Sequence, residues 1–213
     1  MQLSLQQLVP IPLREKVLAH ESQVWNKDIA LQNGYTFIQA PSGTGKTTLI
    51  HILYGIRTDF TGRVAWGGQQ INDLSAAALA ALRTTEISVV FQDMRLFPDL
   101  TTWENLEIKR SLAGNIAEDE VIDWLAQLGI ADKKDSLAAT LSYGEQQRVA
   151  IIRSLLQPFK WLLLDEPFSH LDKANTAKAI ILIDNIVKRN KASMLIADLD
   201  ANEHFSYTQK LVL

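Results

Sequence analysis

Short apolar runs alternate with longer stretches of helical periodicity over most of the chain. The apolar runs carry little polar alternation, as expected for strands that are covered on both faces of a parallel sheet. They predict strands over 35–40, 87–91, 161–164, 193–197 and 211–213. The periodic stretches between them predict helices over 48–54, 74–82, 117–128, 142–156 and 172–188. Apolar strands separated by helices are typical of an α/β protein with a mainly parallel sheet.

The beginning of the chain has a different pattern. Residues 2–9 alternate loosely and are followed by prolines, which predicts a strand and then a loop. Residues 63–71 are typical of a hairpin whose turn is a glycine pair. These segments predict an antiparallel β subdomain near the N-terminus. Residues 13–32 show no pattern that decides between helix, strand and loop.

Residues 93–140 change in character, with more acids than bases and few β-branched runs. Within them, segment 117–128 has acids in its first turn, an apolar face and Gly129 just past its end, which predicts an amphipathic helix. We interpret 93–140 as a helical subdomain inserted into a core formed by 1–92 and 141–213.

Composition narrows the class of protein. With 213 residues, 47% hydrophobic and 21% charged, the chain suits a single folded domain with a sizeable core. Its net charge of −3 gives no general basic character, so we expect no nucleic-acid partner. The lack of cysteine excludes disulfides and cysteine metal sites. No apolar run reaches the ~18 residues of a membrane span, and the N-terminus lacks the pattern of a secretion signal, so we expect a cytoplasmic protein.

Residues 40–48, with the sequence APSGTGKTT, follow a predicted strand and open a predicted helix. Strand, glycine loop, Lys-Thr and helix together form the phosphate-binding loop of proteins that bind nucleoside triphosphates. Glycines let backbone N–H groups turn inward around an anion, and the helix N-terminus adds unpaired N–H groups. The residues expected to bind the nucleotide are Pro41, Ser42, Gly43, Thr44, Gly45, Lys46, Thr47 and Thr48. Ala40 stands where the motif usually has glycine.

Two side chains of this loop have the chemistry that a triphosphate needs. Lys46 can reach the β- and γ-phosphates, and the Thr47 hydroxyl can ligate Mg²⁺. The alternative is a glycine-rich turn without a ligand. Because Gly43, Gly45, Lys46 and Thr47 are all in place, the sequence favours the phosphate site over the bare turn.

Asp165 and Glu166 follow an apolar strand. An enzyme with a phosphate loop needs a carboxylate near its Mg²⁺ and a group that orients or deprotonates water. Asp165 fits the first role and Glu166 fits the second. The alternative is an acid pair solvated at a strand end, which the phosphate loop upstream makes less favoured.

Residues 141–148, LSYGEQQR, form the second strong motif. Ser142 followed by Glu145 predicts a capping box at a helix start, which explains both residues structurally. The same turn is also suited to an anion, because its backbone N–H groups are free and the helix dipole points outward.

Together these motifs resemble the ATP-binding-cassette (ABC) ATPases. The resemblance rests on 40–48, Gln92 after a strand, 141–145, 162–167 and 169–172, in the order of that family. It covers nearly the whole chain and implies a single ABC ATPase domain, 1–213, with a RecA-like P-loop NTPase core. It also implies ATP and Mg²⁺ as cofactors.

In that family two cassettes pair head to tail, so that each ATP lies between the phosphate loop of one and the signature turn of the other. The resemblance implies that Ser142, Gly144 and Glu145 contact the ATP held by the partner. It implies catalytic roles for Lys46, Gln92 and Glu166, and metal ligation by Thr47, Gln92 and Asp165. It further implies a homodimer, or a pair with a related cassette, bound to integral membrane transporter subunits on the cytoplasmic face of the inner or plasma membrane. Residues 93–98 are expected near the groove that receives a helix of those subunits. The alternative for Leu96 and Phe97, equally favoured, is a place in the core of the helical subdomain.

The chain departs from the family pattern in several places. Tyr143 replaces a glycine, and Glu145 replaces the more common glutamine, as in the lipoprotein-export and macrolide-export branch. Residues 11–16 contain no aromatic residue to stack on adenine. Asp198 occupies the place of a histidine that holds the γ-phosphate, and we expect His204, further along, to be solvated rather than folded back.

The leading hypothesis is an ATP-hydrolysing subunit that powers an ABC membrane transporter. The alternative is an ATP-dependent regulatory or binding module with weak hydrolysis, because the histidine and the aromatic residue are missing. Family members that act on DNA or ribosomes usually carry tandem cassettes or coiled-coil inserts, which this chain lacks, and a small-molecule kinase would not need 142–145. The transported substrate is defined by the membrane subunits in this family.

Overall fold

The computed structural model describes residues 1–113, 116–200 and 203–213. Its larger sheet has the strand order β6-β7-β8-β3-β9, and neighbouring strands pair in parallel. The strands are β3 Tyr35–Gln39, β6 Ile87–Val90, β7 Trp161–Asp165, β8 Ser193–Asp198 and β9 Gln209–Val212. The mainly parallel α/β core predicted from the sequence is therefore confirmed.

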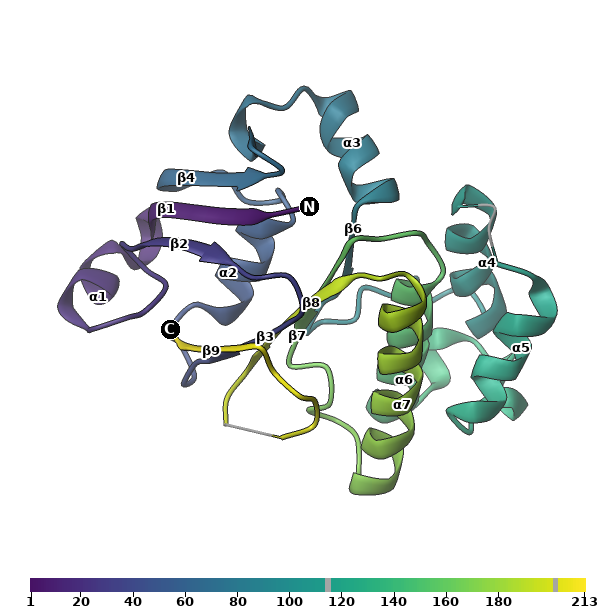
Figure 1. Ribbon diagram of the computed structural model, residues 1–213. Coiled ribbons are helices and arrows are strands. Elements are labelled where there is room, and N and C mark those ends of the chain that lie inside the picture. The colour runs from purple at the N-terminus through teal and green to yellow at the C-terminus, as the bar shows by residue number, and fades with distance from the viewer. Residues whose placement is uncertain (114–115, 201–202) are drawn as a thin grey trace.

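A smaller antiparallel sheet has the strand order β2-β1-β4-β5. Its strands are β1 Leu3–Pro10, β2 Asp28–Leu31, β4 Phe60–Trp66 and β5 Gln69–Gln70. In Figure 1 it forms a separate layer on the side of the molecule where the chain starts. The predicted N-terminal strand and hairpin are both present, as β1 and as the β4–β5 pair.

Residues 13–32, which the sequence pattern left open, contain two short elements. Helix α1 (Arg14–Ala19) buries only Val17, and edge strand β2 leaves most of its residues exposed or half-buried. Neither element is long enough, or buried enough, to produce an apolar period.

Helix α2 (Lys46–Leu53) lies between the two sheets. Its buried apolar residues are Leu49, Ile50, Ile52 and Leu53. They belong to a core cluster that includes Leu5 of β1 and alternate residues of the parallel strands, such as Leu163 and Leu195. Burying each such side chain contributes about 1.5–3 kcal/mol. This packing fixes the start of α2 at the end of β3, which places the phosphate loop.

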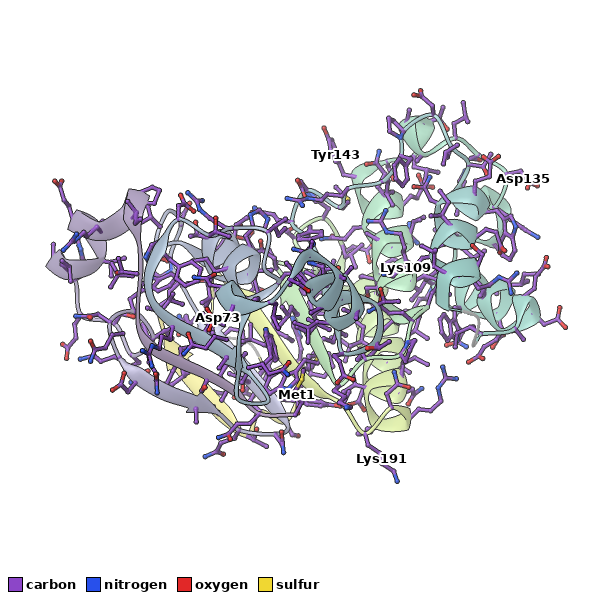
Figure 2. The ribbon with its side chains drawn as sticks, turned by 90° about the horizontal axis from the view of Figure 1, so that it is seen from above. Met1, Asp73, Lys109, Asp135, Tyr143 and Lys191 are labelled. Carbon is purple, nitrogen blue, oxygen red and sulfur yellow. The ribbon has the colours of Figure 1, made fainter. Side chains whose placement is uncertain are left out.

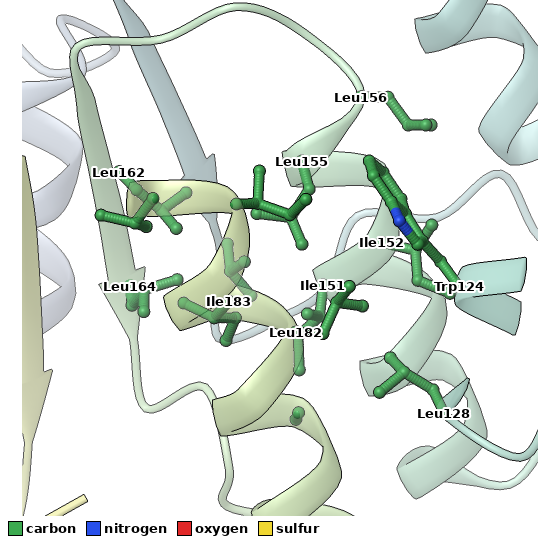
Figure 3. Close-up of a cluster of buried hydrophobic side chains, with 14 of the residues drawn as sticks. Trp124, Leu128, Ile151, Ile152, Leu155, Leu156, Leu162, Leu164, Leu182 and Ile183 are labelled. Atoms are coloured by element: carbon green, nitrogen blue, oxygen red, sulfur yellow. The ribbon is translucent and has the colours of Figure 1, made fainter. Parts of the chain in front are cut away.

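The opposite face of the parallel sheet packs on α6 (Tyr143–Leu155) and α7 (Lys173–Arg189). Figure 3 shows this second cluster, in which side chains of β7, α6 and α7 meet Trp124 and Leu128 at α5 (Glu118–Gln127). The helices predicted over 117–128, 142–156 and 172–188 are thus present, with ends shifted by a residue.

Two further helices complete the described structure. Helix α3 (Ala76–Thr85) begins later than predicted, because the Ser75 hydroxyl accepts a hydrogen bond from the Ala78 N–H and caps the helix there. Helix α4 (Thr102–Ala113) lies beside α5 in the segment expected to be helical (Figure 1). Short 3₁₀ turns occur at Ile11–Leu13, Ile71–Asp73, Ala131–Lys133 and Ala138–Thr140. Among the described helices, none has both the length and the apolar character needed to cross a bilayer.

Candidate functional site

The loop between β3 and α2 has the backbone of a phosphate-binding loop. Gly43 and Gly45 have φ angles of 74° and 107°, which side chains rarely allow. A Cβ at Gly45 would also lie 2.9 Å from Cδ1 of Leu13, which would have to shift, but the positive φ is what favours glycine there. Ala40 is fully buried and its N–H donates to the Asp198 carbonyl at 2.9 Å. Its departure from glycine is therefore accommodated by the fold.

The loop curls around the ammonium group of Lys46. This Nζ donates to the Ala40 carbonyl at 2.8 Å and lies 3.2 Å from Oε1 of Glu166. The Lys46 side chain is only 6% exposed. Its charge is thus held beneath the loop, where phosphate oxygens could replace these partners.

Three oxygen-bearing side chains converge at the start of α2. The Thr47 hydroxyl donates to Oε1 of Gln92 at 3.0 Å. Asp165 is fully buried at the end of β7, and neither of its carboxylate oxygens has a hydrogen-bond partner among the described residues. Burial raises the pKa of Asp165 to about 6, the nearby Thr47 hydroxyl, which lies outside ideal hydrogen-bond geometry, opposes that rise, and the Glu166 charge adds to it. Hydroxyl, amide and carboxylate oxygens are ligands that Mg²⁺ accepts, and the unsatisfied Asp165 fits a cation there.

Glu166 has an unusual backbone for a glutamate. Its φ is 45°, a left-handed conformation that costs about 1–3 kcal/mol outside glycine. Its N–H donates to the Ala197 carbonyl at 2.9 Å, and its own carbonyl accepts from Nε2 of Gln147 at 3.1 Å. Asp165 and Glu166 are both buried, which does not fit a solvated acid pair at a strand end.

The turn that begins α6 carries the predicted capping box. The Ser142 hydroxyl accepts from the Glu145 N–H at 3.4 Å, and Oε2 of Glu145 accepts from the Ser142 N–H at 2.8 Å. These hydrogen bonds, the backbone one first, hold the pKa of Glu145 below its usual value. Tyr143 is absent from the described residues with positive φ, so its replacement of glycine is compatible with this backbone.

Tyr143 and Gly144 face the segment that follows Glu166. Tyr143 is 68% exposed and projects from the surface at the start of α6 (Figure 2). The centroid of its ring lies 5.3 Å from that of the His170 ring. A Cβ at Gly144 would lie 2.8 Å from the His170 carbonyl oxygen. Close backbone contact therefore requires glycine at 144 and leaves 143 free to carry a ring.

One cavity of about 260 Å³ brings most of the expected site residues together. It is lined by Leu13, Ser42, Gly43, Gly45, Lys46, Thr47, Thr48, Gln92 and Glu166. The residues of the signature turn, 142–145, do not line it. Thus the phosphate loop, Gln92 and Glu166 line one cavity within a single chain, with Asp165 buried next to Glu166, whereas the signature turn lies outside that cavity.

A neighbouring cavity of about 420 Å³ was not predicted from the sequence. Leu13, Val17 and Leu213 supply apolar surface to it, beside Pro41 and Thr44 of the phosphate loop. Trp25 also borders it, is buried, and donates from Nε1 to the Thr44 carbonyl at 3.1 Å. A lone tryptophan upstream of the phosphate loop was the one sequence signal for this contact.

The segment after β8 only partly follows the prediction. Burial raises the pKa of Asp198, with the Glu166 charge adding to the rise, and its Oδ1 accepts from the Leu199 N–H at 2.7 Å. His204 is exposed, as predicted, and it does not line the cavity that contains Lys46 and Glu166. Its ring lies edge-on to Phe168, with the ring centroids 5.4 Å apart, and it borders a groove with Asp198, a contact that the sequence did not predict.

A parallel sheet that passes through a glycine loop into a helix, with an acid pair at the end of another strand, defines a P-loop nucleoside triphosphatase. The family model described as "ABC transporter" matches residues 30–169. The chain belongs to the ABC transporter family, as an ATP-binding subunit with ATPase activity coupled to transport.

Curated relatives support this assignment. A lipoprotein-releasing system ATP-binding protein LolD from Nitrobacter winogradskyi is 37% identical over 74% of this chain and 69% of its own length. A protein of the same name from Legionella pneumophila is 33% identical, over 81% of this chain and 78% of its own. An aliphatic sulfonates import ATP-binding protein SsuB from Bacillus cereus is 32% identical, over 88% of this chain and 72% of its own. The chain therefore resembles the lipoprotein-export branch, as Glu145 suggested.

Solved structures with this fold include a dimeric bacterial ABC transporter cassette. It superposes with a TM-score of 0.77 at 23% identity and covers 93% of this chain and 88% of the other. A second structure of that cassette, bound to ADP and phosphate, superposes with a TM-score of 0.75 at 24% identity and the same coverage. These likenesses confirm the ABC cassette fold.

Proposed function

We propose that the chain powers a membrane transporter by closing an ATP sandwich with a second copy, or with a related cassette. The observation that carries this proposal is the division of the site. Lys46, Gln92 and Glu166 line one cavity, whereas Ser142 and Gly144 stand outside it, at a helix N-terminus suited to an anion. A second chain, packed head to tail, brings its signature turn over that cavity.

The phosphate loop, Gln92 and the Asp165–Glu166 pair each have a task in this proposal. The loop N–H groups and Lys46 bind the β- and γ-phosphates. Thr47, Gln92 and Asp165 would hold Mg²⁺, which would supply positive charge to the phosphates. As Lys46 turns toward the phosphates, the carboxylate of Glu166 loses its ion-pair partner and orients or deprotonates the attacking water. Ser142, Gly144 and Glu145 of the partner chain then close over the γ-phosphate.

The adenine base fits the cavity of about 420 Å³ beside the phosphate loop. Leu13, Val17 and Leu213 cover the base with aliphatic groups in place of a stacked aromatic ring. Trp25 contributes by bracing the loop through Thr44 rather than by presenting its ring face, because it is buried. Aliphatic contact gives little discrimination among bases.

The membrane partner is an integral transporter subunit, which places this chain on the cytoplasmic face of the inner or plasma membrane. Residues 93–98 include Phe97, which is 53% exposed, and supply an apolar contact for a helix of that subunit. The similarity to proteins named for lipoprotein release favours a partner of the export branch. Co-purification from membranes followed by identification of the integral partner tests this assignment.

The substitution Glu166→Gln tests the sandwich. It keeps the shape of the side chain and removes the base, so ATP binds but is not turned over. In saturating Mg-ATP this variant is expected to elute as a dimer, and Glu166→Gln combined with Lys46→Ala as a monomer. A Glu166→Gln variant that stays monomeric in Mg-ATP contradicts the sandwich.

Asp198 favours one competing function, an ATP-dependent regulatory module with weak hydrolysis. The Asp198 carboxylate lies near Glu166, so it disfavours further negative charge at this place and opposes binding of the γ-phosphate. Steady-state phosphate release separates the two functions. Background turnover, both with and without the membrane partner, supports the regulatory module.

A further inference from the structure

Gln147 is a buried polar side chain that links two parts of the site. It lies in α6, is only 1% exposed, and uses both ends of its amide. Its Nε2 donates to the Glu166 carbonyl at 3.1 Å and lies 3.3 Å from the Ser169 hydroxyl. Its Oε1 accepts from the His170 N–H at 2.9 Å. A buried amide with its donor and acceptor both used holds its neighbours in one arrangement.

Gln147 holds the backbone of Glu166, which is strained. Glu166 adopts a positive φ, and such a backbone persists only where the surroundings fix it. On one side its N–H is held by Ala197 of β8, and on the other its carbonyl is held by Gln147. A different backbone conformation at Glu166 would move its carboxylate from the present position, 3.2 Å from Nζ of Lys46.

The same helix turn carries the residues offered to the partner chain. Ser142 and Gly144 lie just before Gln147 in α6, and Gly144 packs directly on the His170 carbonyl. Gln147 therefore ties the signature turn to the segment that contains Glu166, Ser169 and His170.

We propose that Gln147 is a positioning residue for ATP hydrolysis. It keeps the Glu166 carboxylate directed at the phosphate loop and fixes the position of Glu166 relative to the signature turn. The proposal rests on the ATP sandwich, because only there does the signature turn meet a nucleotide. Gln147 contacts no residue of the phosphate loop in the described structure, so its loss acts on turnover rather than on ATP binding.

The test compares Gln147→Met with Gln146→Met. Methionine keeps the length of glutamine and removes its polar groups. Gln146 is the matched control, since it has the same residue type in the same helix and its Nε2 donates to the Ala138 and Leu141 carbonyls instead. We measure kcat and KM for ATP hydrolysis, and ATP-induced dimerisation in a Glu166→Gln background. If Gln147→Met does not fold, Gln147→Asn, which shortens the same amide, replaces it.

Gln147→Met is expected to lower kcat at least tenfold, to change KM for ATP less than threefold, and to leave ATP-induced dimerisation in place. Gln146→Met is expected to stay within twofold of the parent in kcat. Equal kcat values for both variants and the parent overturn the role of Gln147 while leaving the sandwich intact. A Glu166→Gln parent that never dimerises overturns the sandwich, and with it the proposal for Gln147.

Discussion

Nζ of Lys46 lies 3.2 Å from Oε1 of Glu166, so the phosphate-loop lysine and the proposed base neutralise each other without nucleotide. Both side chains are nearly buried. Two charges brought out of water in this way stabilise the fold little as a pair, but removing one of them leaves the other buried and uncompensated. Because of this asymmetry, the effect of removing one partner on the free energy of unfolding can be measured without nucleotide.

We expect Lys46→Met to lower the free energy of unfolding by roughly 2–4 kcal/mol, because Glu166 is left as a buried unpaired carboxylate. The double variant Lys46→Met with Glu166→Gln is expected to recover most of that loss, since an amide tolerates burial better than a charge. Urea denaturation of the parent, both single variants and the double variant measures the coupling. Strictly additive losses contradict a direct ion pair.

A second prediction concerns Gly144. Alanine at this helix position should stabilise by about 1 kcal/mol through helix propensity. Because its Cβ meets the His170 carbonyl, we expect Gly144→Ala instead to destabilise by about 1–2 kcal/mol and to abolish ATP-induced dimerisation. Analytical ultracentrifugation and thermal unfolding check both effects.

Tyr143→Ala is the control for that substitution. Its side chain is exposed and its backbone is compatible with any residue, so stability is expected to change by less than about 0.5 kcal/mol. If Gly144→Ala dimerises as well as the parent does, the close packing on His170 has no part in the assembly.

The sequence predicted the central part of the site because its residues are grouped in short, local motifs. Lys46 and Thr47 follow the glycines directly, and Asp165 and Glu166 follow their strand, so backbone geometry alone places each pair. Parallel strands then bring their carboxyl ends to one edge of the sheet, where these groups meet. Only Gln92 depends on a longer connection, and its position after an apolar strand indicated it.

The rest could not be predicted, for physical reasons that differ from place to place. The cavity near Trp25 is lined by Val17 of α1 and by Leu213 from the other end of the chain. Helix α1 is too short and too exposed to leave an apolar period, and no local pattern shows that the two ends meet. His204 is exposed, as expected, but the contact of its ring with Phe168 comes from tertiary packing that no local pattern encodes. Gln147 lies within the 141–148 motif, but the sequence assigned it no role of its own, and only its burial and its hydrogen bonds mark it.

Loss of the Trp25 indole N–H is predicted to weaken the binding of all nucleoside triphosphates by the same factor. Trp25→Phe keeps the buried ring and removes the donor to the Thr44 carbonyl, a hydrogen bond worth about 1 kcal/mol. We expect KM for ATP and for GTP to rise by a similar factor of about 5. Leu18→Ala, on the exposed face of α1, is the matched control and should leave both KM values unchanged. A rise for ATP alone indicates that Trp25 contacts the base.

The capping box at α6 predicts a pH-dependent stability. Hydrogen bonds from Ser142 lower the pKa of Glu145, so its stabilising contribution is present above its unfolded value of 4.5 and is lost as pH falls through the lower folded value. Glu145→Gln removes this titration, and at pH 7 it is expected to cost about 0.5 kcal/mol after solvent screening. Urea denaturation at pH 7 and pH 3 should show the parent and the variant converging in acid.

Glu104 provides a matched control for that experiment. Its carboxylate accepts from the N–H and the hydroxyl of Thr101 in the same way, and its pKa is also lowered by these hydrogen bonds. Glu104→Gln should therefore also reduce the difference in the free energy of unfolding between pH 7 and pH 3. It should leave ATP-induced dimerisation unchanged, since α4 carries no part of the signature turn. Glu145→Gln is expected to retain kcat within about threefold, because the amide keeps an acceptor for the Ser142 N–H. Parallel stability curves for the parent and Glu145→Gln across pH 3–7 show that the carboxylate has no charge-dependent role in the cap.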